Sequence, residues 1–373
     1  MAKHTAASGW LKLFNRNLAT LQRNTRRVQT RATQAVAKQA TAKRKPPATP
    51  GDWLGGLAIG PSGARRYRLY RPPELQPGER LPLLVMLHGC GQDAAGFAQS
   101  TRMNALAKRE RFLVLYPEQD RMASAQRCWN WFDTRSGRAQ GEVALILAAI
   151  DQVCLLQPVD RACVALAGLS AGASMAALIA SHHPARFKAV VMHSGIAPGA
   201  ADSTASALAA MRGHRGPAPR LRAVGQTPLP PLLVIQGARD AVVAASNGEA
   251  AANAWALASE AEAGTPRNKQ RGQRHPMLVT DFKHQGRTAT TLMQVAHLGH
   301  AWSGGARGQP HSDAQGPDAS RLVWAFASRQ FSSTRAPMPA KAPTRLAAQP
   351  ALNIPLLFNP LALFTLNGAT LKP

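Results

Sequence analysis

The stretch Val164-Ala165-Leu166-Ala167-Gly168-Leu169-Ser170-Ala171-Gly172 decides the fold of this chain. An apolar segment typical of a buried strand runs into Gly-x-Ser-x-Gly, and the helix-forming run 173–180 follows. A strand that turns into a helix at such a motif is typical of a nucleophile elbow. We expect the turn to be so tight that Gly168 and Gly172 have no room for a side chain. Ser170 would then lie at the N-terminus of the helix, where backbone N–H groups favour a developing negative charge.

A second apolar run, Leu81–Leu87, ends in the glycine-rich segment His88-Gly89-Cys90-Gly91-Gln92. Such a loop can direct a backbone N–H at a carbonyl oxygen. We expect the Cys90 N–H to do this, together with the N–H of Ala171, the residue after the nucleophile. We expect His88 to brace the loop rather than to react.

Two later segments supply candidates for an acid and a base. The apolar run Pro231–Gln236 continues into a turn that carries Asp240, and His300 lies in a glycine-flanked loop. An α/β-hydrolase has its nucleophile, acid and histidine in this order along the chain. Asp240 would hold the Nδ1–H of His300, whose Nε2 would accept the proton of Ser170.

Each role has an alternative. Ser170 could be an ordinary helix N-cap, and Asp240 could cap a turn. Asp313 and Asp318 are rival acids, although both follow His300 in the chain and so break the usual order.

Two other histidines lie close to these segments. His297 is the rival base, but His300 is favoured because it lies between Gly299 and a turn that ends in two glycines. His193 ends the apolar run Ala189–Met192 and is expected to be a packed strand-end residue.

Aromatic residues follow no helical or strand period in the segment 128–132. Trp129 and Trp131 are expected to line an apolar groove, and Trp302, two residues from His300, is placed to do the same. Asn130 could bind a substrate carbonyl or stabilise the loop, and the sequence favours neither.

At this point the chain resembles the esterases of the polyhydroxybutyrate (PHB) depolymerase family, nearest to the type 2 catalytic domain, which is also related to feruloyl and acetylxylan esterases. The resemblance spans roughly residues 65 to 331. It rests on His88-Gly89-Cys90-Gly91-Gln92, Cys128-Trp129-Asn130-Trp131-Phe132, Gly168-Leu169-Ser170-Ala171-Gly172, Gly299-His300-Ala301-Trp302-Ser303-Gly304-Gly305 and Gly316-Pro317-Asp318-Ala319-Ser320.

The resemblance implies an α/β-hydrolase fold with Ser170, Asp240 and His300 as the triad and the amides of Cys90 and Ala171 as the oxyanion hole. One departure is Gly237-Ala238-Arg239-Asp240, where the family usually has a second acid after the glycine. The triad acid is retained, so Arg239 is expected to change the local charge and not the function.

The alternation of apolar runs and helical patterns predicts a mostly parallel sheet with helices on both faces. We expect strands over Arg66–Tyr70, Leu81–Leu87, Phe112–Tyr116, Val164–Leu169, Ala189–Met192, Leu232–Gln236 and Thr290–Val295. We expect helices over Arg102–Arg109, Glu142–Leu155, the run after Ser170, 248–263 and Ala319–Gln330, with an irregular stretch up to Thr227.

Charge and composition separate the chain into three parts. The 373 residues have a net charge of +26, and residues 1–50 contain eleven basic residues and no acid. This arm is expected to be a basic amphipathic helix, a disordered tail or, least favoured, a transit peptide; the first could bind an anionic or hydrophobic surface or nucleic acid. Residues 51–331 form the expected catalytic domain. Residues 332–373 are expected to be a Pro-rich linker and an apolar tail broken by prolines.

Compartment follows from two observations. Residues 1–30 lack the apolar stretch of a secretory signal and no apolar run is long enough to span a bilayer, which favours the cytoplasm and no transmembrane segment. The four cysteines, Cys90, Cys128, Cys154 and Cys163, would then be thiols. Cys90 and Cys128 could pair if the chain were exported by a non-classical route, which is the alternative.

The order of the candidate triad predicts a serine esterase that needs no cofactor or metal. The family resemblance implies that its substrate is poly(3-hydroxybutyrate) or short hydroxyalkanoate oligoesters. The alternative enzyme is a carboxylesterase of the feruloyl or acetylxylan type. The alternative from another class is a surface protein that coats granules or binds nucleic acid through the arm.

Overall fold

A mixed sheet of eleven strands forms the centre of this protein in a computed structural model, which describes residues 49–214, 221 and 227–332. The strand order is β1-β2-β4-β3-β5-β6-β7-β11-β10-β8, and β9 pairs with β10. The strands are β1 (Asp52–Gly60), β2 (Gly63–Arg71), β3 (Leu81–Leu87), β4 (Leu113–Pro117), β5 (Val159–Leu169), β6 (Ala189–His193), β7 (Leu232–Gly237), β8 (Glu262–Ala263), β9 (Arg267–Lys269), β10 (Met277–His284) and β11 (Arg287–Val295). A separate pair is formed by β12 (Trp302–Ser303) and β13 (Ser312–Asp313).

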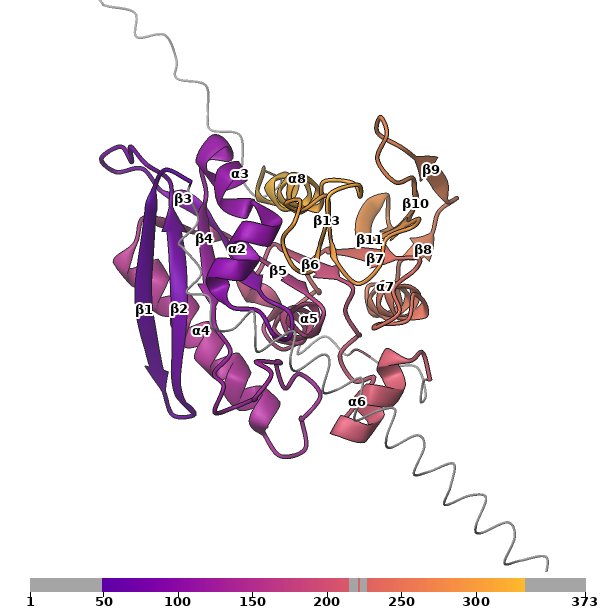
Figure 1. Ribbon diagram of the computed structural model, residues 1–373, viewed down its shortest axis with the longest axis horizontal. Helices are drawn as coiled ribbons and strands as arrows, with labels where there is room; N and C mark the ends of the chain where they lie inside the picture. Colours follow the sequence, from indigo (N-terminus) through magenta and orange to yellow (C-terminus); the bar gives the residue numbers. More distant parts are fainter. Residues whose placement is uncertain (1–48, 215–220, 222–226, 333–373) are drawn as a thin grey trace, which may run out of the picture. The chain divides into compact units, whose positions relative to one another are not determined.

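Helices cover both faces of the sheet (Figure 1). They are α2 (Ala94–Thr101), α3 (Met103–Glu110), α4 (Arg138–Leu156), α5 (Ala171–His182), the 3₁₀ turn η1 (Pro184–Arg186), α6 (Thr204–Met211), α7 (Ser246–Ala258) and α8 (Ala319–Ser332). The strands from β4 through β3, β5, β6 and β7 to β11 are parallel, whereas the pairs at both edges are antiparallel. The mostly parallel sheet predicted from the sequence is confirmed.

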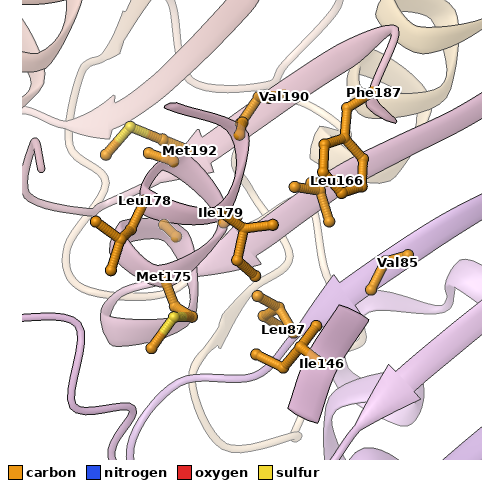
Figure 2. Packing of buried hydrophobic residues seen from close by; sticks show 14 of the residues in the cluster. Val85, Leu87, Ile146, Leu166, Met175, Leu178, Ile179, Phe187, Val190 and Met192 are labelled. Atoms are coloured by element: carbon orange, nitrogen blue, oxygen red, sulfur yellow. The ribbon is translucent and has the colours of Figure 1, made fainter. Parts of the chain in front are cut away.

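The two faces are built from alternate residues of the same strands. In β3, Leu83, Val85 and Leu87 belong to the core beneath α4, α5 and α7, whereas Leu84 and Met86 belong to the core beneath α2, α3 and α8. This follows from the two-residue period of a strand. Figure 2 shows the first of these cores, where residues of β3, β5 and β6 pack against α4 and α5. A strand that is buried on both faces appears in the sequence as a continuous apolar run.

Helix α4 is long and apolar enough, by length and composition alone, to cross a membrane. Here it packs against the sheet, and Val143, Ile146 and Ile150 are buried in the core. The sequence predicts this helix over Glu142–Leu155, and Glu142 and Asp151 within it interrupt any apolar run of bilayer-spanning length.

The structure adds elements that the sequence did not predict, among them β1, β10, α2 and α6. The glycine content of β1 hides it, since glycine is uncommon in strands. Glycine is required there, because a Cβ on Gly56 would lie 2.1 Å from the ring of Tyr67 on the neighbouring strand. The helix predicted over 248–263 ends earlier, at Ala258, and the chain then enters the edge strand β8.

The domain boundaries remain predictions. The expected catalytic domain, 51–331, coincides closely with the main described range. Almost all of the basic arm and of the C-terminal tail lies outside the described residues.

Candidate active site

The nucleophile turn joins β5 to α5 at Ser170. Its backbone has a φ of 56° and a ψ of −124°, a conformation that is strained for a residue with a side chain. A Cβ on Gly168 would lie 2.3 Å from the backbone of Gly172, and a Cβ on Gly172 would lie 2.2 Å from the carbonyl oxygen of Leu87. The prediction that both glycines lack room for a side chain is confirmed. The backbones of β3, β5 and α5 therefore meet with no space between them, and Ser170 lies at the wall of a cavity.

This Ser170 cavity has a volume of about 600 Å³. Cys90, Ala171 and His300 line it together with Ser170. The first N–H groups of a helix have no partner within the helix. Within residues 49–214, 221 and 227–332, neither the Cys90 N–H nor the Ala171 N–H has a hydrogen-bond acceptor. Both are therefore free to bind an oxygen of a ligand in the cavity.

The glycine-rich loop around Cys90 is fixed from two sides. Gln92 accepts a hydrogen bond from the Gly89 N–H through its Oε1 (2.9 Å), and the Gly91 N–H donates to the carbonyl of Gln126 (2.7 Å). These two hydrogen bonds fix the shape of the loop. Gln92 stands in the quoted motif, but its role did not follow from the sequence.

Asp240 and His300 are brought together by the structure. Nδ1 of His300 lies 2.8 Å from Oδ2 of Asp240, whose other oxygen accepts the N–H groups of Val242 (3.0 Å) and Val243 (2.8 Å). Burial alone would raise the pKa of Asp240. The hydrogen bond and charge of His300 and the two backbone N–H groups outweigh burial and lower it. Asp240 is therefore a carboxylate that can fix the orientation of the imidazole.

The Asp240 turn and the His300 loop touch through backbone. A Cβ on Gly237 would lie 2.4 Å from the carbonyl oxygen of Leu298, and the Arg239 N–H donates to that same oxygen (3.0 Å). The Arg239 side chain is exposed. Glycine at the end of β7 thus permits the close approach that aligns the acid with the histidine.

The rival residues have other partners. Asp313 pairs with His275 at 3.4 Å, and Asp318 caps α8 by accepting the Arg321 N–H (3.1 Å). The ring of His297 lies 5.6 Å from that of His275, and His297 does not line the Ser170 cavity.

His193 links the nucleophile turn to the His300 loop. Its carbonyl oxygen accepts the Ser170 N–H (2.8 Å), and its Nε2 accepts the Ser303 N–H (3.1 Å). The ring is fully buried, and burial, aided by the charge of His300, lowers its pKa to about 3. A packed histidine was predicted, but this double contact could not be read from the sequence.

Burial keeps His88 neutral, as it does His193. Its Nε2 accepts the Gln119 N–H (3.1 Å), so the proton is on Nδ1, which donates to the carbonyl of Gly89 (2.8 Å). Burial lowers its pKa to about 4. It contacts the loop that it was expected to brace.

Trp129, Asn130 and Trp131 line the Ser170 cavity, as the sequence predicts for the two tryptophans. The indole N–H of Trp129 donates to the carbonyl of His88 (2.9 Å), and Nδ2 of Asn130 donates to Glu142 (2.7 Å). These contacts favour the loop-stabilising role of Asn130.

Trp302 is not at the cavity, which corrects its predicted role. It is fully buried, stacks on His193 with ring centres 5.0 Å apart, and donates its indole N–H to Ser320 Oγ (3.1 Å). Its ring also forms a T-shaped pair with Phe97, with ring centres 5.5 Å apart. Trp302 therefore points to the opposite side of the loop from His300 and packs beneath α8.

A buried polar network fixes the wall formed by 128–132, and the sequence analysis missed it. Glu142 accepts the backbone N–H of Asn130 (2.9 Å) and the side-chain amide of Gln119. Gln119 also donates to the carbonyl of Cys128 (3.0 Å) and accepts from Arg65. Arg65 lies over the Trp129 ring, 5.3 Å from its centre. Glu142 lies in a helix and Arg65 in a strand, 77 positions apart, so nothing in a single sequence indicates that they belong to one network.

A disulfide bond joins Cys90 to Cys128, and both cysteines line the Ser170 cavity. The bond ties the glycine-rich loop to the segment 128–132, which we call the aromatic wall. Cys154 and Cys163 are buried thiols, as expected for core residues. The sequence left open whether Cys90 and Cys128 pair, and the structure has them paired.

Among the described residues, no group of three His, Cys, Asp or Glu side chains is placed to hold a metal ion. The chemistry available at the cavity is that of a serine, an imidazole paired with a carboxylate, and two free backbone N–H groups.

Comparison with known proteins places this geometry in a family. The model of the family described as esterase PHB depolymerase matches residues 65–265, more than half of the chain. Ser170 and Asp240 lie inside the matched range and His300 lies beyond it, so the position of His300 rests on the geometry above.

Two curated proteins are similar in sequence. Poly(3-hydroxyalkanoate) depolymerase C of Paucimonas lemoignei is 34% identical over 131 residues, which are 35% of this chain and 31% of that protein. Feruloyl esterase B of Neurospora crassa is 30% identical over 149 residues, which are 39% of this chain and 49% of that protein. The chain thus spans a third to a half of the length of these relatives.

Among solved structures, an acetyl xylan esterase from Aspergillus awamori has a TM-score of 0.56 and 17% identity, with 67% of this chain and 94% of that chain covered. This likeness concerns the fold, which is that of the α/β-hydrolase esterases.

Proposed function

We propose that this chain, which belongs to the esterase PHB depolymerase family, hydrolyses carboxylic esters with Ser170 as nucleophile, His300 as base and Asp240 as the acid that orients it. One observation carries the proposal: the imidazole of His300 is hydrogen-bonded to a buried carboxylate and lines the same cavity as a serine on a strained turn. Perturbed or strained groups that converge on a cavity are typical of an active site.

In the first half of the reaction, Oγ of Ser170 attacks the ester carbonyl carbon while Nε2 of His300 takes the hydroxyl proton. The carbonyl oxygen becomes an oxyanion, which the N–H groups of Cys90 and Ala171 bind. The tetrahedral intermediate collapses, and the leaving alcohol departs with the proton from His300. In the second half, water takes the place of the alcohol and releases the free acid. Asp240 remains a carboxylate throughout.

We propose poly(3-hydroxybutyrate) or short hydroxyalkanoate oligoesters as the substrate. The relative from Paucimonas lemoignei supports this choice by its name. The cavity supports it by its size and by its apolar wall, to which Trp131, Ile196 and Met211 contribute. An uncharged polyester segment loses little hydration there and buries its methyl groups.

A feruloyl or acetylxylan ester is the second candidate. The rings of Trp131 and Phe132 meet edge to face at the cavity, with centres 5.6 Å apart, and could flank an aromatic acyl group. The similarity to feruloyl esterase B of Neurospora crassa points the same way.

Hydrolysis by Ser170→Ala tests the nucleophile. The variant should lose about 10⁴- to 10⁶-fold in rate on p-nitrophenyl butyrate, because loss of one triad member removes most of the catalysis. Ser181→Ala, on the same helix but away from the cavity, should retain its rate, since its hydroxyl only bonds the carbonyl of Leu178. Retention of a tenth of the activity by Ser170→Ala would refute the assignment.

A substrate panel tests the specificity. One preparation would be assayed on amorphous PHB, hydroxybutyrate trimer and methyl ferulate. The first two should be cleaved well and the third poorly, and the reverse order would favour the second candidate.

Attachment to PHB granules or nucleic acid through the basic arm stays a prediction, because most of residues 1–50 lie outside the described part of the chain. For compartment, the Cys90–Cys128 disulfide supports the extracellular alternative, because such bonds persist in oxidising surroundings. Thiol labelling of the chain recovered from medium and from cells tests that alternative.

A further inference from the structure

A second cavity, of about 950 Å³, is lined by residues of α8, of β9 and of the loop that follows β9. We call it the Arg274 cavity. It shares no lining residue with the Ser170 cavity, and the proposed ester hydrolysis makes no use of it. Figure 1 shows β9, β10 and α8 in the C-terminal part of the domain.

Positive charge dominates this cavity. Five basic side chains line it against one carboxylate, that of Asp318; they are Arg102, Lys269, Arg271, Arg274 and Arg321. Asp318 is engaged by Arg321 at 3.6 Å. The remaining charge is not neutralised by any carboxylate that lines the cavity.

Two of the arginines are fixed by neutral partners. The Arg102 guanidinium donates to the carbonyl of Gly304 (2.6 Å), and that of Arg274 donates to the carbonyl of Gly316 (2.6 Å). A carbonyl oxygen orients a guanidinium without cancelling its charge, and each guanidinium keeps further N–H donors. These arginines are therefore held in place while their charge remains available to a ligand.

Lys269 and Arg271 complete the cavity from its exposed side. Both side chains are exposed, and within the described residues neither forms an ion pair. The neighbouring Arg267 differs, because it pairs with Asp281 and does not line the cavity.

We propose that the Arg274 cavity binds a chain of linked phosphate groups, such as inorganic tripolyphosphate. Guanidinium groups match the oxygen pairs of phosphate. Several cations around one open volume, two of them held by backbone carbonyls, suit successive phosphates better than a single small anion. No aromatic ring is among the residues that line the cavity, so a nucleobase has no surface on which to stack. This favours a bare phosphate chain over single-stranded nucleic acid.

The test compares two charge reversals of equal size in the full chain, because the basic arm also attracts anions. Lys269→Glu/Arg271→Glu changes the cavity. Arg66→Glu/Arg287→Glu is the matched control, since both residues are exposed on strands and neither lines the cavity. Sodium tripolyphosphate would be titrated into each protein by calorimetry at fixed ionic strength, with orthophosphate as a second ligand.

The cavity variant should bind tripolyphosphate about tenfold more weakly than the control, and orthophosphate should bind the unmodified chain far more weakly than tripolyphosphate. Equal weakening in both variants would overturn the proposal, because binding would then follow net charge alone. Orthophosphate binding as tight as tripolyphosphate would also overturn it.

Binding of a labelled oligothymidine tests whether the cavity binds nucleic acid instead. If the cavity variant loses oligothymidine binding while tripolyphosphate fails to compete for it, the cavity binds nucleic acid and the proposal is wrong. Ester hydrolysis should be unchanged in both variants, which shows that they are folded. Failure of phosphate binding would leave the proposed esterase activity untouched.

Discussion

The nucleophile turn and the aromatic wall of the same cavity are held in place by different physics. At the turn, backbone meets backbone, so that a single methyl group at Gly172 would collide with the carbonyl of Leu87. At the wall, Glu142 accepts the N–H of Asn130 and Gln119 donates to the carbonyl of Cys128; together with a disulfide, these buried hydrogen bonds hold residues 128–132. An added methyl group at a backbone contact forces the backbone to move, whereas loss of one buried hydrogen bond costs about 1 to 3 kcal/mol and leaves the other bonds in place. A single substitution at the turn should therefore cost much more stability than a single substitution at the aromatic wall.

The largest effect is expected at Gly172→Ala. The added Cβ would meet the carbonyl oxygens of Leu87 and His88 at 2.2 and 2.5 Å, and β3 would have to move. We expect a loss of about 3 kcal/mol or more in the free energy of unfolding, or no folded protein. Gly141→Ala in α4 is the control, since its nearest contact is the flexible Ser62 side chain at 3.2 Å. Equal urea midpoints for the two variants would show that the turn is not sterically locked.

Asp240→Asn should come next, with turnover lowered about 10⁴-fold and stability little changed, because an amide misorients the imidazole. Steady-state kinetics on a soluble ester measures the loss. Asp318→Asn and Asp313→Asn serve as comparisons and should do much less. A crippling effect of Asp318→Asn would reassign Asp240 as a turn residue.

Acid should weaken both regions through their buried histidines. His88 and His193 have pKa values of about 4 and 3 in the folded chain, below the ordinary value of 6.5. The unfolded chain therefore takes up the protons first, so stability is complete above pH 6.5 and falls as the pH drops towards 4. From pH 7 to 5 each histidine should cost about 2 kcal/mol in the free energy of unfolding.

Urea unfolding across this pH range measures the loss, and His88→Gln should have a shallower pH dependence than the unmodified chain. His214→Gln is the control, because His214 is exposed. An unchanged slope in His88→Gln would mean that His88 is not held neutral.

The smallest effect is expected at Glu142→Gln. An amide at this position turns one acceptor into a donor that faces the N–H groups of Asn130 or Gln119, which should cost about 1 to 2 kcal/mol. KM for a bulky ester should rise more than kcat falls, because the wall moves and the triad does not. Glu249→Gln is the control, because Glu249 is exposed and its hydrogen bond with Gln294 lies at the surface. A kcat loss as large as that of Asp240→Asn would place Glu142 in the chemistry itself.

The same contrast explains what the sequence could predict. The nucleophile turn requires two glycines at a fixed spacing on one short segment. The turn and its flanking strand and helix could therefore be predicted from residues 164–180 alone. The central strands were predicted because they are buried on both faces. The approach of Asp240 to His300 was predicted from the order of motifs, and the structure brings the two side chains together.

The wall was predicted poorly because its contacts come from distant positions. Arg65, Gln119 and Glu142 lie on a strand, a loop and a helix, and each looks like an ordinary polar residue in its own segment. Trp302 was placed in the groove because it is near His300 in sequence, whereas a partner for its indole N–H, Ser320, draws it into the core. The glycines of β1 concealed a strand for a reason that only the neighbouring Tyr67 reveals.

The Cys90–Cys128 bond also changes the covalent topology of the chain. It closes a ring that contains α2, α3 and β4, with the almost fully exposed Met122 on its perimeter. A protease that cuts the backbone once near Met122 would open the ring without dividing the molecule. The nicked protein would migrate as a single chain until a reductant is added, and only then release two fragments.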